Sequence, residues 1–213
     1  MKNRPFSSIK IKESGLVLFQ IALILFLVLN SQITIGQEIV FDQYIRNNKV
    51  GTLSVFIHED RDRAEKTIRI ESKVSVSMLF LSTVVNYEGK SVFRSGKLIM
   101  AEIQICRDGS PYQDSEVHWR GDHYLAVIDG SEINIKENEI LFSSLLLYAK
   151  EPRNTSRVFA EIDGVFNRLE HKGRGKYELH IRGSRNNYYT YRNGELVEAK
   201  LDHWLAPIYL KRQ

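Results

Sequence analysis

Alternation between apolar and polar residues is the clearest pattern in the chain. From Thr67 to Met78, isoleucine, valine and methionine residues alternate with charged residues and serines. The same two-residue period recurs at Leu53–Ile57 and at Tyr177–Arg182. Such strands have one apolar and one polar face. This is typical of antiparallel sheets, because strands buried in parallel sheets are apolar on both faces. The pattern therefore predicts a mainly β fold built on an antiparallel sheet.

Turn-forming dipeptides separate the alternating stretches. Asp-Gly at residues 108–109 and 129–130, and Asn-Gly at 193–194, supply the positive φ angles that tight hairpin turns require. In the middle of the chain such signals recur at intervals of about ten residues, which is typical of consecutive hairpins. The predicted strands cover residues 98–107, 112–120, 123–128 and 132–135. The simplest topology is a meander of about ten strands in one sheet.

One stretch breaks the β pattern. Leu141–Lys150 carries clustered leucines, and Ser143 or Ser144 is predicted to cap a short helix that ends before Pro152. A meander of this size closes into a barrel, splits into a sandwich, or curls around the helix. We expect the third arrangement, because an apolar helix fills the concave side of a sheet that buries only one face. The predicted fold is a single antiparallel meander sheet, strongly curled as a half-barrel or open barrel, with one short helix near 143–150.

The N-terminal residues have the composition of a secretory signal peptide. Basic residues precede an apolar stretch from Leu16 to Leu29, and small and polar residues follow up to Gly36. Cleavage is predicted before Gln37, which divides the chain into a signal over 1–36 and one β-rich domain over 37–213. Because polar residues interrupt the apolar run, cleavage is preferred over an uncleaved membrane anchor, which is the alternative.

Charge and cysteine content limit the partners of the mature domain. Residues 1–36 hold four of the 30 lysine and arginine residues and one of the 26 acidic residues, so the mature net charge is +1. This balance argues against nucleic acid as a partner. Cys106 is the single cysteine, which excludes an intrachain disulfide and leaves an inert thiol or an intermolecular disulfide. The exported product, periplasmic or extracellular, is expected to be no lipoprotein and to keep no stable membrane span.

Few residues suggest catalysis or metal binding. His118 and His123 flank a turn, but their spacing is not a known ligand pattern, and neither a metal nor another cofactor is predicted. The mature chain lacks the Gly-x-Ser-x-Gly element of serine hydrolases. Carboxylates from distant strands can still meet, which keeps a hydrolase as an alternative. In the aromatic cluster, Tyr188 lies on the opposite face from Tyr189 and Tyr191, so the cluster provides core packing or a stacking platform for sugars.

Most of the mature chain resembles a known family. The segments that carry the resemblance are Leu145–Pro152, Val158–Glu161 with Gly164, Tyr177–Leu179, Tyr189–Leu196, Lys49–Leu53 and Phe93–Leu98. They resemble a family of small exported bacterial proteins described as domain of unknown function 6134. The resemblance implies an envelope protein of a Gram-negative bacterium of the Bacteroidota type, with no assigned activity and no functional residues. The expected architecture is also distantly similar to periplasmic lipoprotein carriers, whose curved sheet holds acyl chains against a helical lid.

The predicted function is a non-catalytic binding or carrier module. An apolar or amphipathic ligand is expected between the curved sheet and the segment Leu145–Tyr148, a usual place for pockets. The predicted ligand-binding residues bracket this segment: Tyr148, Glu151, Phe159 and Glu161. The alternative for these residues is that they anchor a crossover between strands. The alternative for the protein is a structural or interaction partner of an envelope complex that acts through exposed strand edges.

Overall fold

Strands dominate the described part of the chain. The computed structural model describes residues 35–78, 81–183, 185–202 and 206–213. The elements in chain order are β1 (Ile35–Ile45), β2 (Asn48–Asp60), β3 (Glu65–Met78), β4 (Leu81–Arg94), β5 (Lys97–Arg107), β6 (Ser110–Trp119), β7 (Tyr124–Ile128), β8 (Ser131–Ile135), the 3₁₀-helix η1 (Leu145–Tyr148), β9 (Arg157–Ala160), β10 (Val165–Gly173), β11 (Lys176–Ile181), β12 (Arg185–Arg192), β13 (Glu195–Leu201) and β14 (Ile208–Arg212). None of the helical structure in the described residues is long and apolar enough to cross a membrane.

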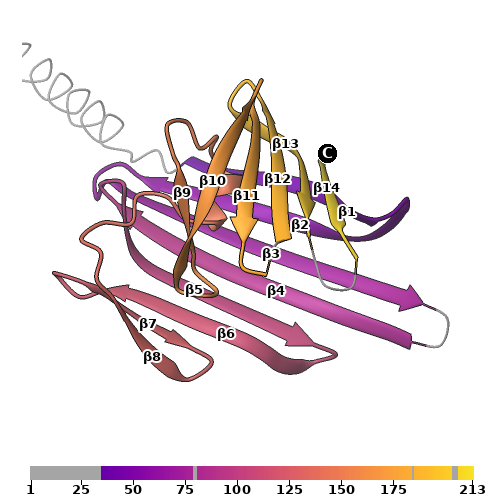
Figure 1. Ribbon diagram of the computed structural model, residues 1–213, viewed down its shortest axis with the longest axis horizontal. Helices are drawn as coiled ribbons and strands as arrows, with labels where there is room; N and C mark the ends of the chain where they lie inside the picture. Colours follow the sequence, from indigo (N-terminus) through magenta and orange to yellow (C-terminus); the bar gives the residue numbers. More distant parts are fainter. Residues whose placement is uncertain (1–34, 79–80, 184, 203–205) are drawn as a thin grey trace, which may run out of the picture. The chain divides into compact units, whose positions relative to one another are not determined.

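These strands form one 14-stranded antiparallel sheet, in the order β8-β7-β6-β5-β4-β3-β2-β1-β14-β13-β12-β11-β10-β9. The chain makes two meanders, β1–β8 and β9–β14, and the pairing of β1 with β14 joins them. β8 and β9 are therefore the two edges of the sheet (Figure 1). The predicted antiparallel meander is confirmed, with fourteen strands instead of about ten.

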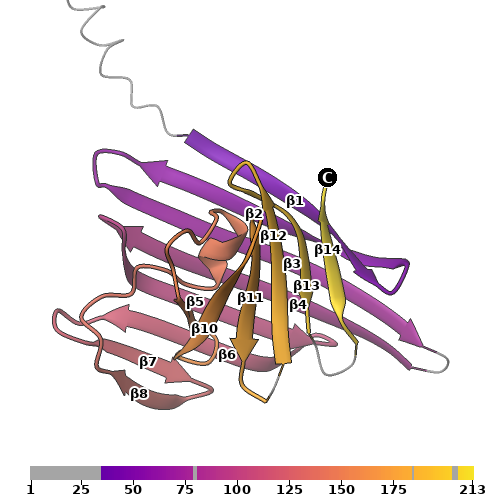
Figure 2. The same cartoon turned by 45° about the horizontal axis from the view of Figure 1, so that its top comes forward.

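The sheet curls so that its two halves face one another. Figures 1 and 2 show β9–β13 crossing over the long strands β3–β5, with η1 between the two layers. The turn before β10 reaches β7 near the opposite edge. A Cβ atom placed on Gly164 of this turn would lie 3.6 Å from Ile128 Cδ1 and 3.7 Å from Ala126 Cβ. The edge strands β8 and β9 are not paired with one another, so the sheet remains open and the predicted curled, open sheet is confirmed.

Alternation along β3 explains which face of the sheet lies inside. Ile68, Ile70 and Val74 are buried, whereas Arg69 and Glu71 between them are exposed. Inward-facing side chains from both halves of the sheet form one hydrophobic core, which includes the buried leucines of η1. Full burial of one aliphatic side chain contributes about 1.5–3 kcal/mol. The curl is therefore stabilised by the removal of two apolar sheet faces from water.

The hairpin turns have the geometry that the dipeptides predict. The φ angles are 51° at Asp108 and 82° at Gly109, and both residues of the turns at 129–130 and 193–194 also have positive φ. This conformation suits two-residue turns between twisted strands. The four strands predicted between residues 98 and 135 are found as β5–β8, with ends that differ by a few residues.

The predicted helix is a single turn of 3₁₀-helix. Ser144 occupies the N-cap position of η1, but its side chain makes no capping hydrogen bond, so the prediction of a serine cap is wrong. The start of η1 is capped instead by the carboxylate of Glu161. This carboxylate accepts hydrogen bonds from the N–H of Ser144 at 3.0 Å and from the N–H of Leu145 at 3.2 Å. A longer side chain from a distant part of the chain thus replaces the local cap.

The predicted signal peptide lies mostly outside the described residues, since nothing before residue 35 is described. The predicted cleavage point after Gly36 lies within β1, where Gly36 is opposite His58 of β2. Cleavage of the signal stays a prediction.

Candidate functional site

A groove lies beside η1, at the end of the sheet where β2 and β3 are joined. Its volume is about 460 Å³, and we call it the η1 groove. Its lining residues are Glu59, Asp60, Arg61, Ala64, Glu65, Lys66, Phe93, Gly96, Leu141, Leu146 and Lys150. The groove thus borders both the sheet and η1, the two elements between which the sequence predicts a ligand.

The floor of the η1 groove is apolar. Phe93 of β4 is 3% exposed and Leu146 of η1 is 6% exposed. Leu141, which precedes η1, is 58% exposed, the largest value for a large apolar side chain in the described residues. Together these residues extend the hydrophobic core to the surface and offer a contact for an alkyl chain.

The carboxylates on the rim of the η1 groove have partners of their own. Glu59 pairs with Lys66 at 2.7 Å, and Glu65 pairs with Arg94 at 3.0 Å. Asp60 accepts two backbone hydrogen bonds from the turn that follows it. The hydrogen bond from Lys66 lowers the pKa of the Glu59 carboxyl below its usual value. Each of these three carboxylates therefore already has a hydrogen-bond or ion-pair partner within the protein.

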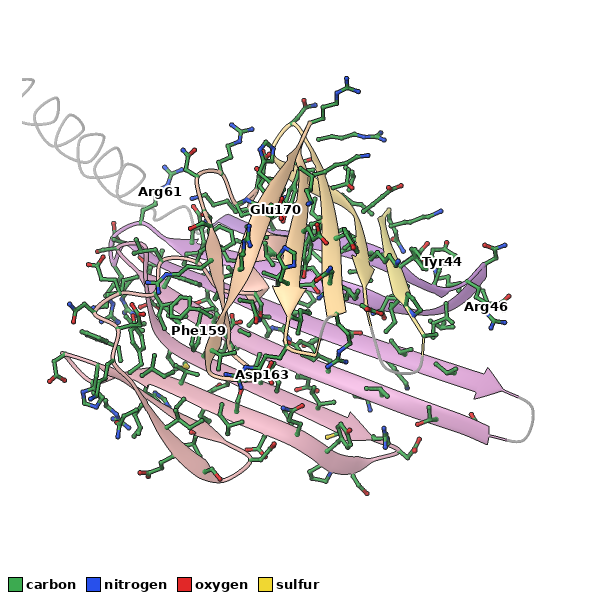
Figure 3. All side chains as sticks on the ribbon, viewed as in Figure 1. Tyr44, Arg46, Arg61, Phe159, Asp163 and Glu170 are labelled. Carbon is green, nitrogen blue, oxygen red and sulfur yellow. The ribbon has the colours of Figure 1, made fainter. Side chains whose placement is uncertain are left out.

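Two cations on the rim of the groove, unlike Lys66, are not engaged in ion pairs with the described residues. The side chains of Arg61 and Lys150 are exposed and form no hydrogen bond or ion pair with any described residue. Arg61 belongs to the turn between β2 and β3 (Figure 3). Lys150 follows η1, and its backbone N–H donates to the Leu146 carbonyl at 2.9 Å. The groove therefore combines an apolar floor with two cations that form no hydrogen bond or ion pair with the described residues.

Glu161 holds η1 from the interior. Its carboxylate is 0% exposed and, besides the N–H groups of Ser144 and Leu145, accepts the Ser91 hydroxyl at 3.0 Å. The Ser144 hydroxyl donates a fourth hydrogen bond to the same carboxylate. Because Ser91 lies on β4 and Glu161 follows β9, these bonds tie η1 to both halves of the sheet.

Tyr148 ends η1 inside the curled sheet. Its ring lies edge-on to Phe41 of β1 at 6.4 Å and to Tyr189 of β12 at 6.5 Å. Burial raises the pKa of Tyr148 well above its usual value, with smaller contributions from neighbouring tyrosines and from Glu161. Tyr148 therefore packs η1 against strands of both meanders.

The other two predicted residues lie away from the η1 groove. Glu151 accepts hydrogen bonds from the Tyr177 hydroxyl at 3.1 Å and from Arg153 Nε at 2.8 Å. It lines a second groove, of about 1010 Å³, between the loop that follows η1 and strands β10 and β11. Phe159 of β9 is fully buried, and its ring packs edge-on against Phe166 at 5.3 Å.

The structure brings three of the four predicted residues to η1, because Tyr148 ends it and both Glu161 and the Phe159 carbonyl accept the N–H of Ser144. None of the four lines the η1 groove, and a role of these four residues in binding stays a prediction. Sequence reasoning missed the floor of the groove. Leu141 begins the stretch that breaks the β pattern, and this is a local signal for it. Phe93 is one of many inward-facing apolar residues on strands, so nothing in its sequence context marks it.

Three potential metal ligands lie together on β10 and β11. Ligand atoms of Glu170, Glu178 and His180 lie within 4.8 Å of one another. The Lys172 ammonium lies 3.0 Å from the carboxylate of Glu170 and 2.8 Å from that of Glu178, and it lowers the pKa of both carboxyls. The Lys172 ammonium therefore balances the negative charge of these two carboxylates.

The aromatic cluster on β12 divides between the two faces of the sheet. Tyr188 is 41% exposed, whereas Tyr189 and Tyr191 are each 3% exposed. The Tyr191 hydroxyl donates to the Leu147 carbonyl at 2.6 Å, which adds another contact between η1 and the sheet. The predicted division of faces is confirmed, and two of the three rings serve the core.

We expect the buried tyrosines to reduce stability in alkali. Burial raises the pKa of Tyr189 to about 12. Because this folded-state pKa lies above the unfolded value of about 10, the stabilisation is complete below pH 10 and is lost as the pH rises toward 12. The shift corresponds to about 3 kcal/mol. Urea midpoints measured from about pH 9 to about pH 12 should therefore fall.

The variant Tyr189→Phe isolates this contribution from that of the lysines, which titrate in the same range. It should lose less stability than the unaltered protein between about pH 10 and about pH 12. Equal losses in the two proteins would contradict the assignment to Tyr189.

Comparisons with known proteins support the fold and define the family. The crystal structure of a β-barrel-like protein of domain of unknown function DUF1849 from Brucella abortus is similar, with a TM-score of 0.60 and 9% sequence identity. The similarity covers 86% of this chain and 98% of that chain, and at this identity it shows the fold alone. No curated protein matches the sequence. The family model described as domain of unknown function (DUF6134) matches residues 41–213, so the chain belongs to that family.

Proposed function

We propose that the protein is a non-catalytic module that binds or carries an amphipathic ligand in the η1 groove. The observation that carries this proposal is the exposed Leu141 beside Phe93 and Leu146, in a groove of about 460 Å³. Ligand pockets commonly have volumes of about 300–1,000 Å³, with mostly apolar walls and a few polar groups. An apolar floor inside a charged rim matches a ligand with an alkyl chain and a polar headgroup.

Three of the residues predicted from the sequence position the groove in this proposal. Glu161 fixes the start of η1, and Tyr148 fixes its end against both meanders. The backbone carbonyl of Phe159 accepts the N–H of Ser144 at 2.8 Å, which ties the segment before η1 to the edge strand β9. These contacts hold Leu146 at the groove floor, so we assign these residues an indirect role in binding.

The proposal includes export to the periplasm or another compartment of the envelope. Its support is the composition of residues 1–36, where basic, apolar and small polar residues follow one another as in a signal peptide. A groove that covers an alkyl chain keeps that chain out of water while the ligand is away from a membrane.

Native mass spectrometry of the protein purified from the cell that makes it tests the proposal. We expect an added mass that denaturation releases and a polypeptide mass that begins at Gln37. Leu141→Asn should lose the added mass, because the amide replaces the apolar contact with the alkyl chain. The variant should keep its fold, since substitutions of exposed residues usually change stability by less than about 0.5 kcal/mol.

Ile133→Asn is the matched control. Ile133 is 40% exposed on β8 and does not line the η1 groove, so its replacement should leave the added mass in place. A bare polypeptide in every preparation would contradict ligand binding. An added mass that persists in Leu141→Asn would contradict the assignment to this groove.

The edge strand β8 favours a second candidate function, that of an interaction partner in an envelope complex. Among the described strands β8 pairs with β7 alone, and four of its five residues are exposed. The other edge is covered, because Ser143 forms a parallel bridge with Phe159 of β9. An open edge offers backbone groups to a strand of another protein. A bare mass combined with reproducible cross-links from β8 to one envelope protein would favour this function over ligand binding.

A further inference from the structure

We propose that the ligand of the η1 groove carries an anionic headgroup, which Arg61 and Lys150 bind while the alkyl chain lies on the apolar floor. This inference rests on the proposed function, because it concerns the same groove. The lining contains three cations and three carboxylates, so composition alone favours neither sign of charge. The ion pairs and hydrogen bonds that these groups form within the protein determine which sign of charge the groove favours in a ligand.

The three carboxylates are already neutralised. Glu59 pairs with Lys66 across the hairpin at 2.7 Å. Glu65 pairs with Arg94, which belongs to β4 and does not line the groove. Asp60 accepts two backbone hydrogen bonds and lies 3.6 Å from a neighbouring guanidinium. A cationic headgroup would have to displace one of these partners, and would gain little by the exchange.

Arg61 and Lys150 are the cations that remain. Both side chains are exposed, and neither has a hydrogen bond or ion pair with the described residues. Arg61 attracts Glu59 only at longer range, and it lowers the pKa of that carboxyl less than Lys66 does. Arg61 lies in the turn before β3 and Lys150 follows η1, so the two cations line the groove beside the sheet and beside η1.

These two cations match the chemistry of an anionic headgroup. A guanidinium donates two parallel hydrogen bonds to a carboxylate or phosphate, and an ammonium adds a compact charge. An uncharged headgroup would accept hydrogen bonds from the two cations but would lack the attraction between opposite charges. Carboxylate and phosphate share the recognised feature, an anionic group at the end of an alkyl chain.

The test compares ligands with one chain length and different headgroups. Calorimetry would measure the affinity of the purified protein for dodecanoate, dodecyl phosphate and the uncharged 1-dodecanoylglycerol. At low ionic strength we expect at least one of the anions to bind roughly tenfold more tightly than the uncharged ester. Added salt should reduce this preference, because the two cations are exposed. The ratio of the two anion affinities separates a carboxylate from a phosphate ligand.

A double variant tests the two residues. Arg61→Gln combined with Lys150→Gln should remove the preference for anions over the uncharged ester, because the glutamine amides donate hydrogen bonds but carry no charge. Arg46→Gln is the control, because Arg46 is also exposed and lies in the β1–β2 turn, at the opposite end of these strands from Arg61 (Figure 3). The melting temperatures of all variants should equal that of the unaltered protein.

The outcomes separate this inference from the proposed function. Equal affinities for the ester and both anions would overturn the headgroup inference and leave the proposed function intact. A preference that survives in the double variant would overturn the assignment to Arg61 and Lys150. Binding of none of the three ligands would overturn the proposed function itself, and the headgroup inference with it.

Discussion

Replacement of Glu161 by alanine should destabilise the protein by at least about 3 kcal/mol. The carboxylate is 0% exposed and accepts hydrogen bonds from two backbone N–H groups and two serine hydroxyls. Alanine leaves the Leu145 N–H and the buried Ser91 hydroxyl without their acceptor, whereas the Ser144 N–H keeps the Phe159 carbonyl. Each unsatisfied buried donor costs about 1–3 kcal/mol. Since folded domains are stable by only about 5–15 kcal/mol, the urea midpoint should fall strongly.

Two further variants provide a scale for the destabilisation caused by Glu161→Ala. Ser91→Ala removes one of the four hydrogen bonds to Glu161 and should cost about 1 kcal/mol. Glu198→Ala removes an exposed carboxylate on β13 and should change stability by less than about 0.5 kcal/mol. If Glu161→Ala lost less than about 1 kcal/mol, the carboxylate would not be the group that holds η1.

Replacement of Gly51 by alanine should be almost as damaging, for a steric reason. A Cβ atom at Gly51 would lie 1.9 Å from the Lys73 carbonyl oxygen and 3.1 Å from Gln43 Oε1. The first of these atoms belongs to the backbone of β3, so β2 and β3 have to separate to admit a methyl group. We expect a loss of about 3 kcal/mol, which for a chain of this length lowers the melting temperature by about 10 °C.

Thr52→Ala is the control for Gly51→Ala. Thr52 is the next residue of β2, and its side chain is exposed. Calorimetric scans should show little change for Thr52→Ala, since substitutions of exposed residues usually change stability by less than about 0.5 kcal/mol. Similar melting temperatures for the two variants would mean that the pairing of β2 with β3 adapts to a side chain at Gly51.

Much of the sheet was predictable because strand formation depends on neighbours in the chain. The alternation at Thr67–Met78 identified β3 and its buried face. The dipeptides at 108–109 and 129–130 placed two turns, because both positions need positive φ. The joining of β1 to β14 had no such local signal, since it pairs the first and last of the described strands.

The candidate site was predictable only in part. The break in the pattern at Leu141–Lys150 located η1, and the position of Glu161 near it in sequence made it a candidate. The η1 groove depends on residues that meet only when the sheet curls, such as Phe93 and Leu146. The charge that the groove presents to a ligand also depends on ion pairs formed in the folded protein, because Arg94, which does not line the groove, neutralises Glu65.

The sequence by itself determined the β class, the antiparallel pairing, the turns and the place of the short helix. Each of these follows from the period of side chains or from the φ angles that nearby residues allow. The tertiary structure alone decided the curl of the sheet, the four hydrogen bonds to Glu161, and the lack of a hydrogen bond or ion pair from Arg61 and Lys150 to any described residue. The physical reason is that burial and charge pairing join residues far apart in the chain: Ser91 and Glu161 are separated by 70 positions.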